Sequence, residues 1–343
     1  MKGEQVKSKN KFDFQVDFVI PWVDGSDEEW SKKKDKYLEN KNQGSTEERY
    51  RDFGTLRYLL RSIEKYANWF HKIYLITDNQ IPEWLQLNER ICVVDHTEYI
   101  PKKFLPTFNS NVIELNIWRI HDLSEHFILL NDDLLFTKKT SKKDFFTNDG
   151  MPRDITAQSI LMPRDDFSHI AVNNISLINN LFNKREWLRK NWQLAFSLKN
   201  GLVFNTLSLI VSPLPYFTRF VDPHIGIAYI KQNFIKIWEI FPERLTQTSV
   251  NRFRKYNEVS HWLVRYYQIV SGQVSPRSYK FSKYYDISDV VKLKKEFAKP
   301  THKMIVLNDG NLNNDTYKLG METMVLLDTF LHNYSQFEKK DDL

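Results

Sequence analysis

The chain has 343 residues, enough for one large domain or two smaller ones, and its 41% hydrophobic and 27% charged residues are typical of a globular protein. A formal charge of +6 without a dense basic run suits an anionic small substrate or an anionic membrane surface, and argues against nucleic acid as a partner. The single cysteine excludes an internal disulfide and a cysteine-based zinc site, and the lack of a signal peptide or of an apolar run of ~18 residues favours the cytoplasm.

Short apolar runs alternate with amphipathic stretches along the first half of the chain. These runs predict buried strands at residues 16–20, 73–77, 91–94 and 127–130. Helical spacing predicts helices at residues 54–67 and 112–120, and residues 32–48 are predicted as a charged helix followed by a loop. The second half is less regular, with helices predicted at 227–240, 259–270 and 316–333, a loop plus a helix at 271–299, and a strand at 304–307.

The alternation of strands and helices predicts an α/β fold with a mainly parallel sheet. In such sheets, ligands bind beyond the carboxyl ends of the strands. Three of the predicted strands end in loops that carry aspartates, namely Asp24, Asp78 and the pair Asp132-Asp133. The sequence therefore predicts an active site at this edge of the sheet.

Two acidic loops could carry chemistry. Asn131-Asp132-Asp133 could hold Mg²⁺ or Mn²⁺ through oxygen ligands and so neutralise a diphosphate, although an aspartate pair is also common as a turn or helix cap. Asp24-Gly25-Ser26-Asp27 could bind a ribose, a metal or an acceptor hydroxyl. Alternatively, Asp27 caps a helix, because two glutamates follow it.

Three further groups stand in the second half of the chain. His224, beside a proline, could be a general base or a phosphate partner, or it could be structural. Arg252 and Arg254, with Glu258 nearby, suit phosphate oxygens, and a surface ion pair is the alternative. Asn308-Asp309 is a polar turn after a strand. Since the chain lacks a phosphate-binding glycine loop, a dinucleotide fingerprint and a serine nucleophile elbow, the classes that need them are disfavoured.

As an ordered set, these segments resemble the four conserved blocks of the Stealth family. Residues 17–27 (DFVIPWVDGSD) resemble the first block, and a long second block runs from Arg51-Asp52 through ITDNQIP at 76–82 to Asn131-Asp132-Asp133. The third block is similar around Pro223-His224 and residues 253–259, and the fourth is Leu307-Asn308-Asp309. The family comprises bacterial capsule hexose-1-phosphate transferases and the animal N-acetylglucosamine-1-phosphotransferase.

The resemblance implies a glycosyltransferase-A-like or Rossmann-like fold with a helical insertion. It also implies transfer of a sugar together with its phosphate from a UDP-sugar to a hydroxyl of a glycan or lipid-linked oligosaccharide, with release of UMP. A conventional glycosyltransferase that releases UDP and a non-catalytic glycan-binding protein are the alternatives. Carried onto this chain, the expected catalytic residues are His224, Arg254, Asp133 and Asp24, and the expected ligands of Mg²⁺ (or Mn²⁺) are Asp132, Asp133 and Asp309. The expected substrate-binding residues are Trp22, Gly25, Asp27, Arg57, Asp78, Asn109, Ser110, Asn131, Arg252, Glu258 and Asn308.

The same resemblance suggests how the chain is organised. Residues 1–140 would form the nucleotide-sugar-binding half, 141–215 a variable helical insertion, and 216–343 the completion of a single catalytic unit with a C-terminal helix. Residues 185–220 combine tryptophan, arginine and aliphatic side chains. This stretch could rest on the inner face of the cell membrane, or it could be a buried helical subdomain.

Overall fold

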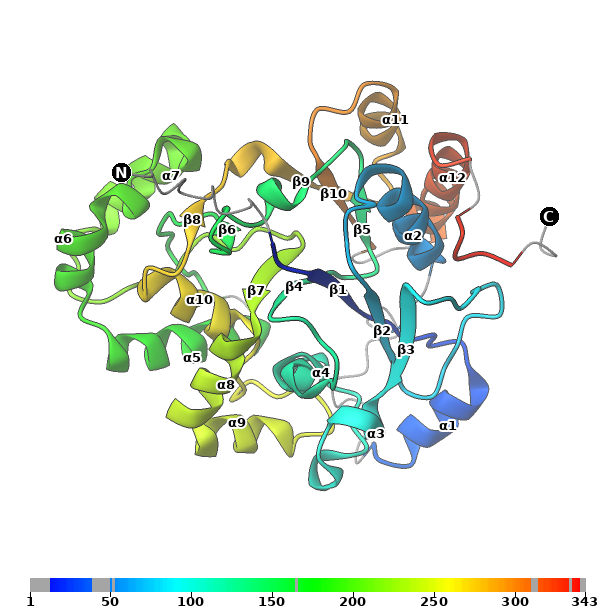
Figure 1. Cartoon of the computed structure of the whole chain (residues 1–343), viewed down its shortest axis with the longest axis horizontal. Coiled ribbons are helices and arrows are strands. Elements are labelled where there is room, and N and C mark those ends of the chain that lie inside the picture. The colour runs from blue at the N-terminus through cyan, green and yellow to red at the C-terminus, as the bar shows by residue number, and fades with distance from the viewer. Residues whose placement is uncertain are drawn as a thin grey trace, which may run out of the picture.

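A computed structural model describes residues 13–38, 50, 53–163, 166–309, 314–332 and 335–339. A five-stranded sheet lies at its centre, in the order β3-β2-β1-β4-β7 (Figure 1). Four of its strands are parallel and the edge strand β7 is antiparallel to β4. Their bounds are β1 Val16–Pro21, β2 Ile73–Thr77, β3 Ile91–Asp95, β4 His126–Leu129 and β7 Ile227–Ile230.

A second, three-stranded sheet has the order β5-β10-β9. Strand β10 pairs antiparallel with β5 and parallel with β9. A short parallel pair, β6 with β8, stands apart from both sheets. The bounds are β5 Leu134–Phe136, β6 Arg153–Asp154, β8 Ser275–Pro276, β9 Ser282–Asp286 and β10 Met304–Asn308.

Helices cover the sheets in separate groups. Helices α5, α6 and α7 gather at one side of the molecule, and α2, α11 and α12 lie at the other (Figure 1). The α-helices are α1 Glu28–Asp35, α2 Thr55–Tyr66, α3 His96–Tyr99, α4 Ser110–Asn116, α5 Asp166–Leu181, α6 Lys184–Ala195, α7 Leu202–Val211, α8 Lys231–Ile240, α9 Pro242–Ser249, α10 Trp262–Val270, α11 Val290–Ala298 and α12 Asn314–Phe330. Within the described residues, no helix is both long enough and apolar enough to cross a membrane.

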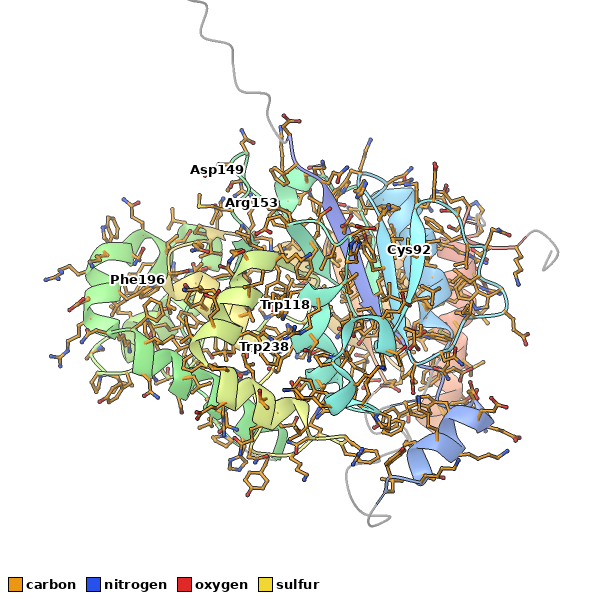
Figure 2. All side chains as sticks on the ribbon, turned by 60° about the horizontal axis from the view of Figure 1, so that its bottom comes forward. Cys92, Trp118, Asp149, Arg153, Phe196 and Trp238 are labelled. Carbon is orange, nitrogen blue, oxygen red and sulfur yellow. The ribbon has the colours of Figure 1, made fainter. Side chains whose placement is uncertain are left out.

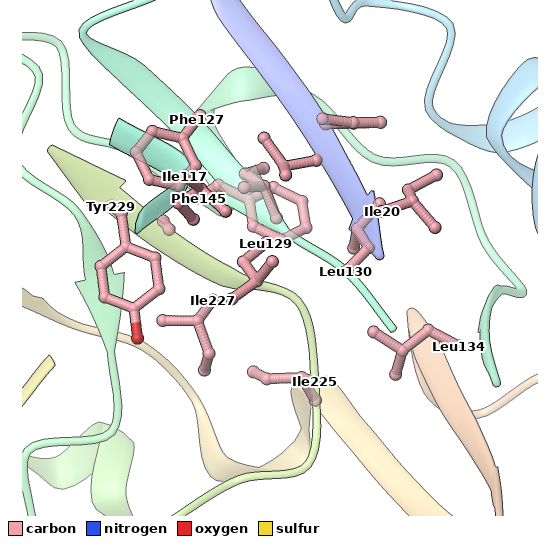
Figure 3. Close-up of a cluster of buried hydrophobic side chains, with 14 of the residues drawn as sticks. Ile20, Ile117, Phe127, Leu129, Leu130, Leu134, Phe145, Ile225, Ile227 and Tyr229 are labelled. Atoms are coloured by element: carbon pink, nitrogen blue, oxygen red, sulfur yellow. The ribbon is translucent and has the colours of Figure 1, made fainter. Parts of the chain in front are cut away.

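The core lies around the central sheet. Both faces of the central strands are buried, which explains why they read as continuous apolar runs rather than as alternating ones. Phe127 and Leu129 of β4 pack close to Ile227 and Tyr229 of β7 (Figure 3). Burying one such side chain contributes roughly 1.5–3 kcal/mol, so this packing fixes the position of β7 on the sheet.

Two buried polar networks join segments that are far apart in the sequence. The carboxylate of Asp17, which is fully buried in β1, accepts hydrogen bonds from the backbone N–H groups of Lys72 and Ser124 at 3.1 and 2.7 Å. Arg265 of α10 is also fully buried and pairs with Asp154 at 2.6 Å and Asp222 at 2.8 Å. This second network joins segments on both sides of residue 215. The predicted division of the chain into residues 1–140, 141–215 and 216–343 remains a prediction.

Aromatic side chains support the helices beneath the sheet. Trp118 and Trp238 lie close together (Figure 2), and the Arg119 guanidinium stands over both rings at 4.1 and 5.0 Å. The indole N–H of Trp238 donates to the carbonyl of Leu115 at 2.9 Å. These contacts attach α8 to α4, a helix whose first residues line the site described below.

The predicted α/β class with a mainly parallel sheet is confirmed, as are the strands expected near residues 16–20, 73–77, 91–94, 127–130 and 304–307. The expected helix at 227–240 is wrong over its first four residues. These residues form β7, because the apolar run Ile-Ala-Tyr-Ile is buried against β4, and α8 begins only at Lys231. The segment expected as loop plus helix at 271–299 also contains β9.

The charged helix expected from residue 32 begins earlier, at Glu28. The side chain of Asp27 accepts hydrogen bonds from the N–H groups of Glu29 and Trp30 at 2.8 and 3.1 Å. Asp27 is therefore the helix cap that the acidic pair after it indicated. The end of the predicted segment, residues 39–48, lies outside the described residues.

Candidate active site

A pocket of about 530 Å³ opens at the carboxyl ends of β1, β2 and β4. The end of β10 reaches the same place, because the backbone N–H of Leu307 donates to the carbonyl of Asp133 at 3.0 Å. Strand β7 runs the other way, so its first residues, rather than its last, lie at this edge. This brings His224, three positions before β7, into the pocket wall.

Ten of the predicted site residues line the pocket. They are Trp22, Asp78, Ser110, Asn131, Asp132, Asp133, His224, Arg254, Asn308 and Asp309. They come from the ends of β1, β2, β4 and β10, from the start of α4, from the segment before β7 and from the loop before α10. The structure thus brings together side chains that are up to 287 positions apart in the sequence.

Three of the carboxylates that line the pocket follow β4 and β10: Asp132, Asp133 and Asp309. The Oδ1 atom of Asp133 is buried and accepts no hydrogen bond from the described residues. Burial raises the pKa of Asp133 to about 7, and repulsion from Asp309 acts in the same direction. An added positive charge would relieve both effects.

A complete protein-only metal site is not formed by the part of the chain that the structure describes. No group of three or more His, Cys, Asp or Glu side chains there could hold a metal ion. Magnesium, however, commonly binds through one or two carboxylates plus waters and substrate phosphates. Asp133, with its uncompensated buried oxygen, and the neighbouring Asp309 fit that kind of site.

His224 stands at the mouth of the pocket with an exposed side chain. Its ring centroid lies 5.3 Å from that of Tyr284 on β9. Desolvation by the surrounding protein lowers the pKa of His224, while the charges of Asp222 and Arg219 act in opposite directions. The imidazole is therefore neutral near pH 7 and is able to accept a proton.

The loop that carries Arg254 is held by a buried carboxylate. Glu258 is fully buried and accepts hydrogen bonds from the side-chain amides of Asn109 at 2.9 Å and Asn111 at 2.8 Å. The guanidinium of Arg254 donates to the hydroxyl of Ser110 at 2.5 Å. Glu258 and Asn109 thus connect the loop to the start of α4 and position Arg254, and neither lines the pocket.

Glu114 and His261 also line the pocket, and sequence reasoning missed both. Burial raises the pKa of Glu114 to about 7, and burial lowers the pKa of His261 to about 3. The two side chains approach to 3.6 Å, and the imidazole Nδ1 of His261 lies 2.7 Å from the hydroxyl of Tyr229. Since burial dominates both shifts, the two groups can share a site without separated charge.

A further polar group lies at the end of β2. Asp78 pairs with Lys33 at 2.6 Å, and the neighbouring His96 is 5% exposed. Burial lowers the pKa of His96 to about 4, so its ring is neutral at pH 7. The pocket lining also includes the buried tryptophans Trp22 and Trp30, and the Trp30 ring packs against Tyr50 at 5.0 Å and Phe108 at 5.7 Å.

Comparison with known proteins shows which family this chain belongs to. Stealth protein conserved region 1 matches residues 14–42, and conserved region 2 matches residues 49–154. The exopolysaccharide phosphotransferase cps2G of Lactiplantibacillus plantarum is 42% identical over 330 residues, which cover 95% of this chain and 97% of that protein. The chain belongs to the Stealth family.

Other relatives agree with this membership. The capsular polysaccharide phosphotransferase WcwK of Streptococcus pneumoniae is 39% identical over 337 residues, which cover 95% of this chain and 98% of that protein. The receptor polysaccharide phosphotransferase WefC of Streptococcus gordonii is 34% identical, with 94% of this chain and 99% of that protein covered. Among solved structures, the galactosyltransferase LgtC in complex with donor and acceptor sugar analogs is 11% identical, has a TM-score of 0.36, and is matched over 93% of this chain and 98% of that one.

Two of the four blocks predicted for a Stealth chain are confirmed by the matched regions, and the third and fourth remain predictions. Within the first block, Asp24 and Gly25 do not line the pocket. The carboxylate of Asp24 accepts from the N–H and hydroxyl of Ser26 at 2.8 and 2.6 Å. A Cβ at Gly25 would lie 2.1 Å from the carbonyl oxygen of Tyr50, so only glycine fits there.

Three other predicted substrate residues of the Stealth chain lie away from the pocket lining: Asp27, Arg57 and Arg252. Arg57 pairs with Glu338 at 3.7 Å and stands over the Trp84 ring at 4.9 Å. Arg252 lies 4.8 Å from the ring centroid of Tyr37. The geometry gives these residues, like the cap Asp27, positions in the scaffold, and their predicted contacts with substrate remain untested.

Gln80 is a scaffold residue that sequence reasoning did not single out. Its side-chain amide exchanges two hydrogen bonds with the backbone of Asp24, at 3.0 and 2.9 Å, and donates to Asp27 at 3.1 Å. It therefore fixes the loop after β1 against the loop after β2. Both loops belong to the matched regions of the Stealth family.

Proposed function

We propose that the chain transfers hexose- or N-acetylhexosamine-1-phosphate from a UDP-sugar to a hydroxyl of a glycan acceptor, with release of UMP. Relatives that match 94–95% of this chain are named phosphotransferases of capsular, receptor or exopolysaccharide. The observation that carries the proposal is the single pocket in which Asp133 and Asp309 meet His224 and Arg254. Carboxylates, a neutral histidine and an arginine are the groups that a phosphoryl transfer requires.

In this reaction, the acceptor oxygen forms a bond to the β-phosphorus, and the bond between that phosphorus and the oxygen of UMP breaks. His224 takes the hydroxyl proton, because it is neutral near pH 7 and exposed to the pocket. Asp24, the other expected catalytic residue that could take this proton, is the alternative base. Asp24 does not line the pocket, and its Oδ1 atom accepts both hydrogen bonds from Ser26, so the geometry favours His224.

Arg254 stabilises the charge that builds on the non-bridging phosphate oxygens. Its guanidinium is oriented by the hydroxyl of Ser110, and its loop is held by Glu258. A donor that is already oriented needs little rearrangement during the reaction, and such donors are worth about 10²–10³ in rate. Glu114 and His261 line the same pocket, and desolvation favours the neutral form of each side chain.

Asp133 and Asp309 are the residues that would hold Mg²⁺ or Mn²⁺, with Asp132 beside them. A divalent ion bound there would neutralise the diphosphate of the donor. The chain itself supplies a buried carboxylate oxygen without a partner and a second carboxylate that repels it. Asn131 and Asn308 add amide groups to the same part of the pocket.

The fate of the β-phosphate tests the proposal. A UDP-sugar labelled in its β-phosphate is incubated with Mg²⁺, purified protein and a glycan acceptor, and the product is examined by ³¹P NMR. A new phosphodiester signal on the acceptor is expected, and it should be absent with Arg254→Ala. A sugar attached without phosphate would make the chain a conventional glycosyltransferase and would overturn the proposal.

We also propose that the chain works in the cytoplasm and contacts the inner face of the membrane, where a lipid-linked acceptor would be available. Helix α7 contains no charged residue, and five side chains of this region are 61–94% exposed: Leu198, Leu202, Val203, Leu209 and Ile210. Exposed apolar patches of this kind mark interaction surfaces. Flotation with lipid vesicles should enrich the protein, and a Leu198→Ser/Leu202→Ser variant should lose that enrichment.

A further inference from the structure

A second cavity, of about 500 Å³, lies at the end of β10 that is remote from the active site. Thr301 and Lys303, just before β10, line this cavity, whereas Asn308 at the other end of the strand lines the active-site pocket. Seven of its twelve lining residues are lysine or arginine and one, Asp144, is acidic. The cavity is therefore strongly positive and separate from the catalytic residues.

The guanidinium of Arg277 is buried without a hydrogen-bond partner among the described residues, and burying an unpaired charge costs free energy. The residue is 4% exposed, and none of its three guanidinium nitrogens has a hydrogen-bond partner among the described residues. Its guanidinium stands over the Phe281 ring at 4.7 Å and the Phe145 ring at 5.5 Å. Buried polar groups in proteins nearly always have a partner, so this arginine lacks the one that its planar fork is suited to bind.

The acid in the cavity does not supply that partner. Asp144 accepts a hydrogen bond from Lys303 at 2.5 Å, and its other oxygen accepts from the backbone of Ser141 at 2.8 Å. Lys138 is also used, since it donates to the carbonyl of Thr301 at 3.0 Å. The missing partner of Arg277 must therefore come from outside the described residues, and a phosphate group has the charge and the oxygens that match.

Apolar surface adjoins the cavity directly. Lys199 lines the cavity, while its neighbour Leu198 is 94% exposed and Leu202, the first residue of α7, is 83% exposed. The rings of Phe204 and Tyr279 pack together at 5.9 Å, so α7 lies against the segment that contains Arg277. A basic cavity beside bare leucine side chains matches a lipid, which carries a charged headgroup and an apolar chain, better than it matches a soluble sugar phosphate.

We propose that this cavity binds the phosphate headgroup of an anionic lipid, with Arg277 against the phosphate and Leu198 and Leu202 in the apolar layer. The inference rests on the membrane contact proposed above for α7 and goes beyond it, because it assigns a defined headgroup site. Phosphate bound at Arg277 would fix how the protein sits on the surface. The catalytic pocket, at the other end of β10, would stay open to donor and acceptor.

The test measures binding to vesicles of phosphatidylcholine alone and of phosphatidylcholine with phosphatidic acid. Wild-type protein is expected to bind the anionic vesicles at least ~10-fold more tightly, and Arg277→Gln should lose most of that difference, as for the loss of a charged hydrogen-bond donor. Lys318→Gln removes one charge from an exposed position on α12 and is the matched control. It should change binding less than about twofold, the scale of long-range screened charge.

A second variant covers the case in which Arg277→Gln folds poorly. Lys199 and Lys280 are exposed residues of the cavity, and Lys199→Gln/Lys280→Gln should weaken anionic-vesicle binding without disturbing the buried guanidinium. If Leu198→Ser/Leu202→Ser abolishes binding to all vesicles while Arg277→Gln and the lysine pair bind as wild type, the membrane contact stands and the headgroup site is wrong. Stabilisation by inorganic phosphate that depends on Arg277, without selective vesicle binding, would also overturn the lipid assignment. UMP release onto a soluble acceptor, measured in parallel, reports separately on the transfer reaction.

Discussion

Replacing Glu258 by glutamine should both destabilise the protein and slow the reaction. The carboxylate accepts from Asn109, Asn111 and the backbone N–H of Lys255, at 2.9, 2.8 and 2.9 Å. Glutamine keeps one acceptor oxygen, so its new NH₂ group would face one of the asparagine amides. One charge-assisted hydrogen bond, about 1.5–3 kcal/mol, is then lost. Removing a buried charge offsets part of this, because burial raises the pKa of Glu258, and a net loss of about 2 kcal/mol is expected.

Urea unfolding and steady-state kinetics together check this prediction. We expect kcat to fall about 10- to 100-fold, as for a misplaced catalytic group, because Arg254 is no longer held near Ser110. Glu243→Gln, on the exposed first turn of α9, is the matched control and should change stability by less than about 0.5 kcal/mol. Unchanged stability with a raised KM would refute the reasoning, since it would mean that Glu258 binds the donor directly.

Three further predictions follow from the pocket. His224→Ala and Arg254→Ala should each lower kcat by at least ~100-fold in a folded protein, and full activity of either variant would remove the role assigned to that residue. In the wild type, kcat/KM should fall only below pH ~6.5, because desolvation lowers the pKa of His224 below its ordinary value. Asp133→Asn should abolish activity without lowering stability, since the native carboxylate is buried and its pKa is raised to about 7; a large drop in stability would contradict this. Glu114 has a folded pKa of about 7, above its ordinary value, so the stability that it contributes is present at low pH and is lost as the pH rises through about 7. Glu114→Gln should therefore gain stability relative to wild type between about pH 4.5 and pH 7, by up to about 1.4 kcal/mol per pH unit, and the difference should level off above pH 7. A difference that stays constant across this window would show that the pKa of Glu114 is not raised by burial.

Much of the fold could be predicted from local pattern. The central parallel strands are buried on both faces, so each one reads as an apolar run, and aspartates follow three of them. Asp133 and Asp78 were found in this way, and both line the pocket. The cap at Asp27 could be predicted too, because a helix start has a local sequence pattern.

The rest depends on contacts between distant segments. The apolar run of four residues before Lys231 fits a helix or a strand equally well. Its pairing with β4 is what makes it a strand, β7. His224 reaches the pocket because of that pairing. The family resemblance makes Glu258 an expected substrate-binding residue, and that role remains a prediction. The sequence does not show its hydrogen bond with Asn109, 149 positions away, which holds the loop against the start of α4. Glu114 lies one turn after Ser110, but the predicted helix began too late to place the two on one face.

The nucleotide that is released tests the central claim most directly. Purified protein is incubated with Mg²⁺ and a panel of UDP-sugars, with and without a capsular glycan acceptor, and the nucleotide product is identified by chromatography. The account predicts UMP that forms only when acceptor is present and that disappears with His224→Ala. Release of UDP would contradict it, because the phosphate would then remain on the nucleotide and the pocket would belong to a conventional glycosyltransferase.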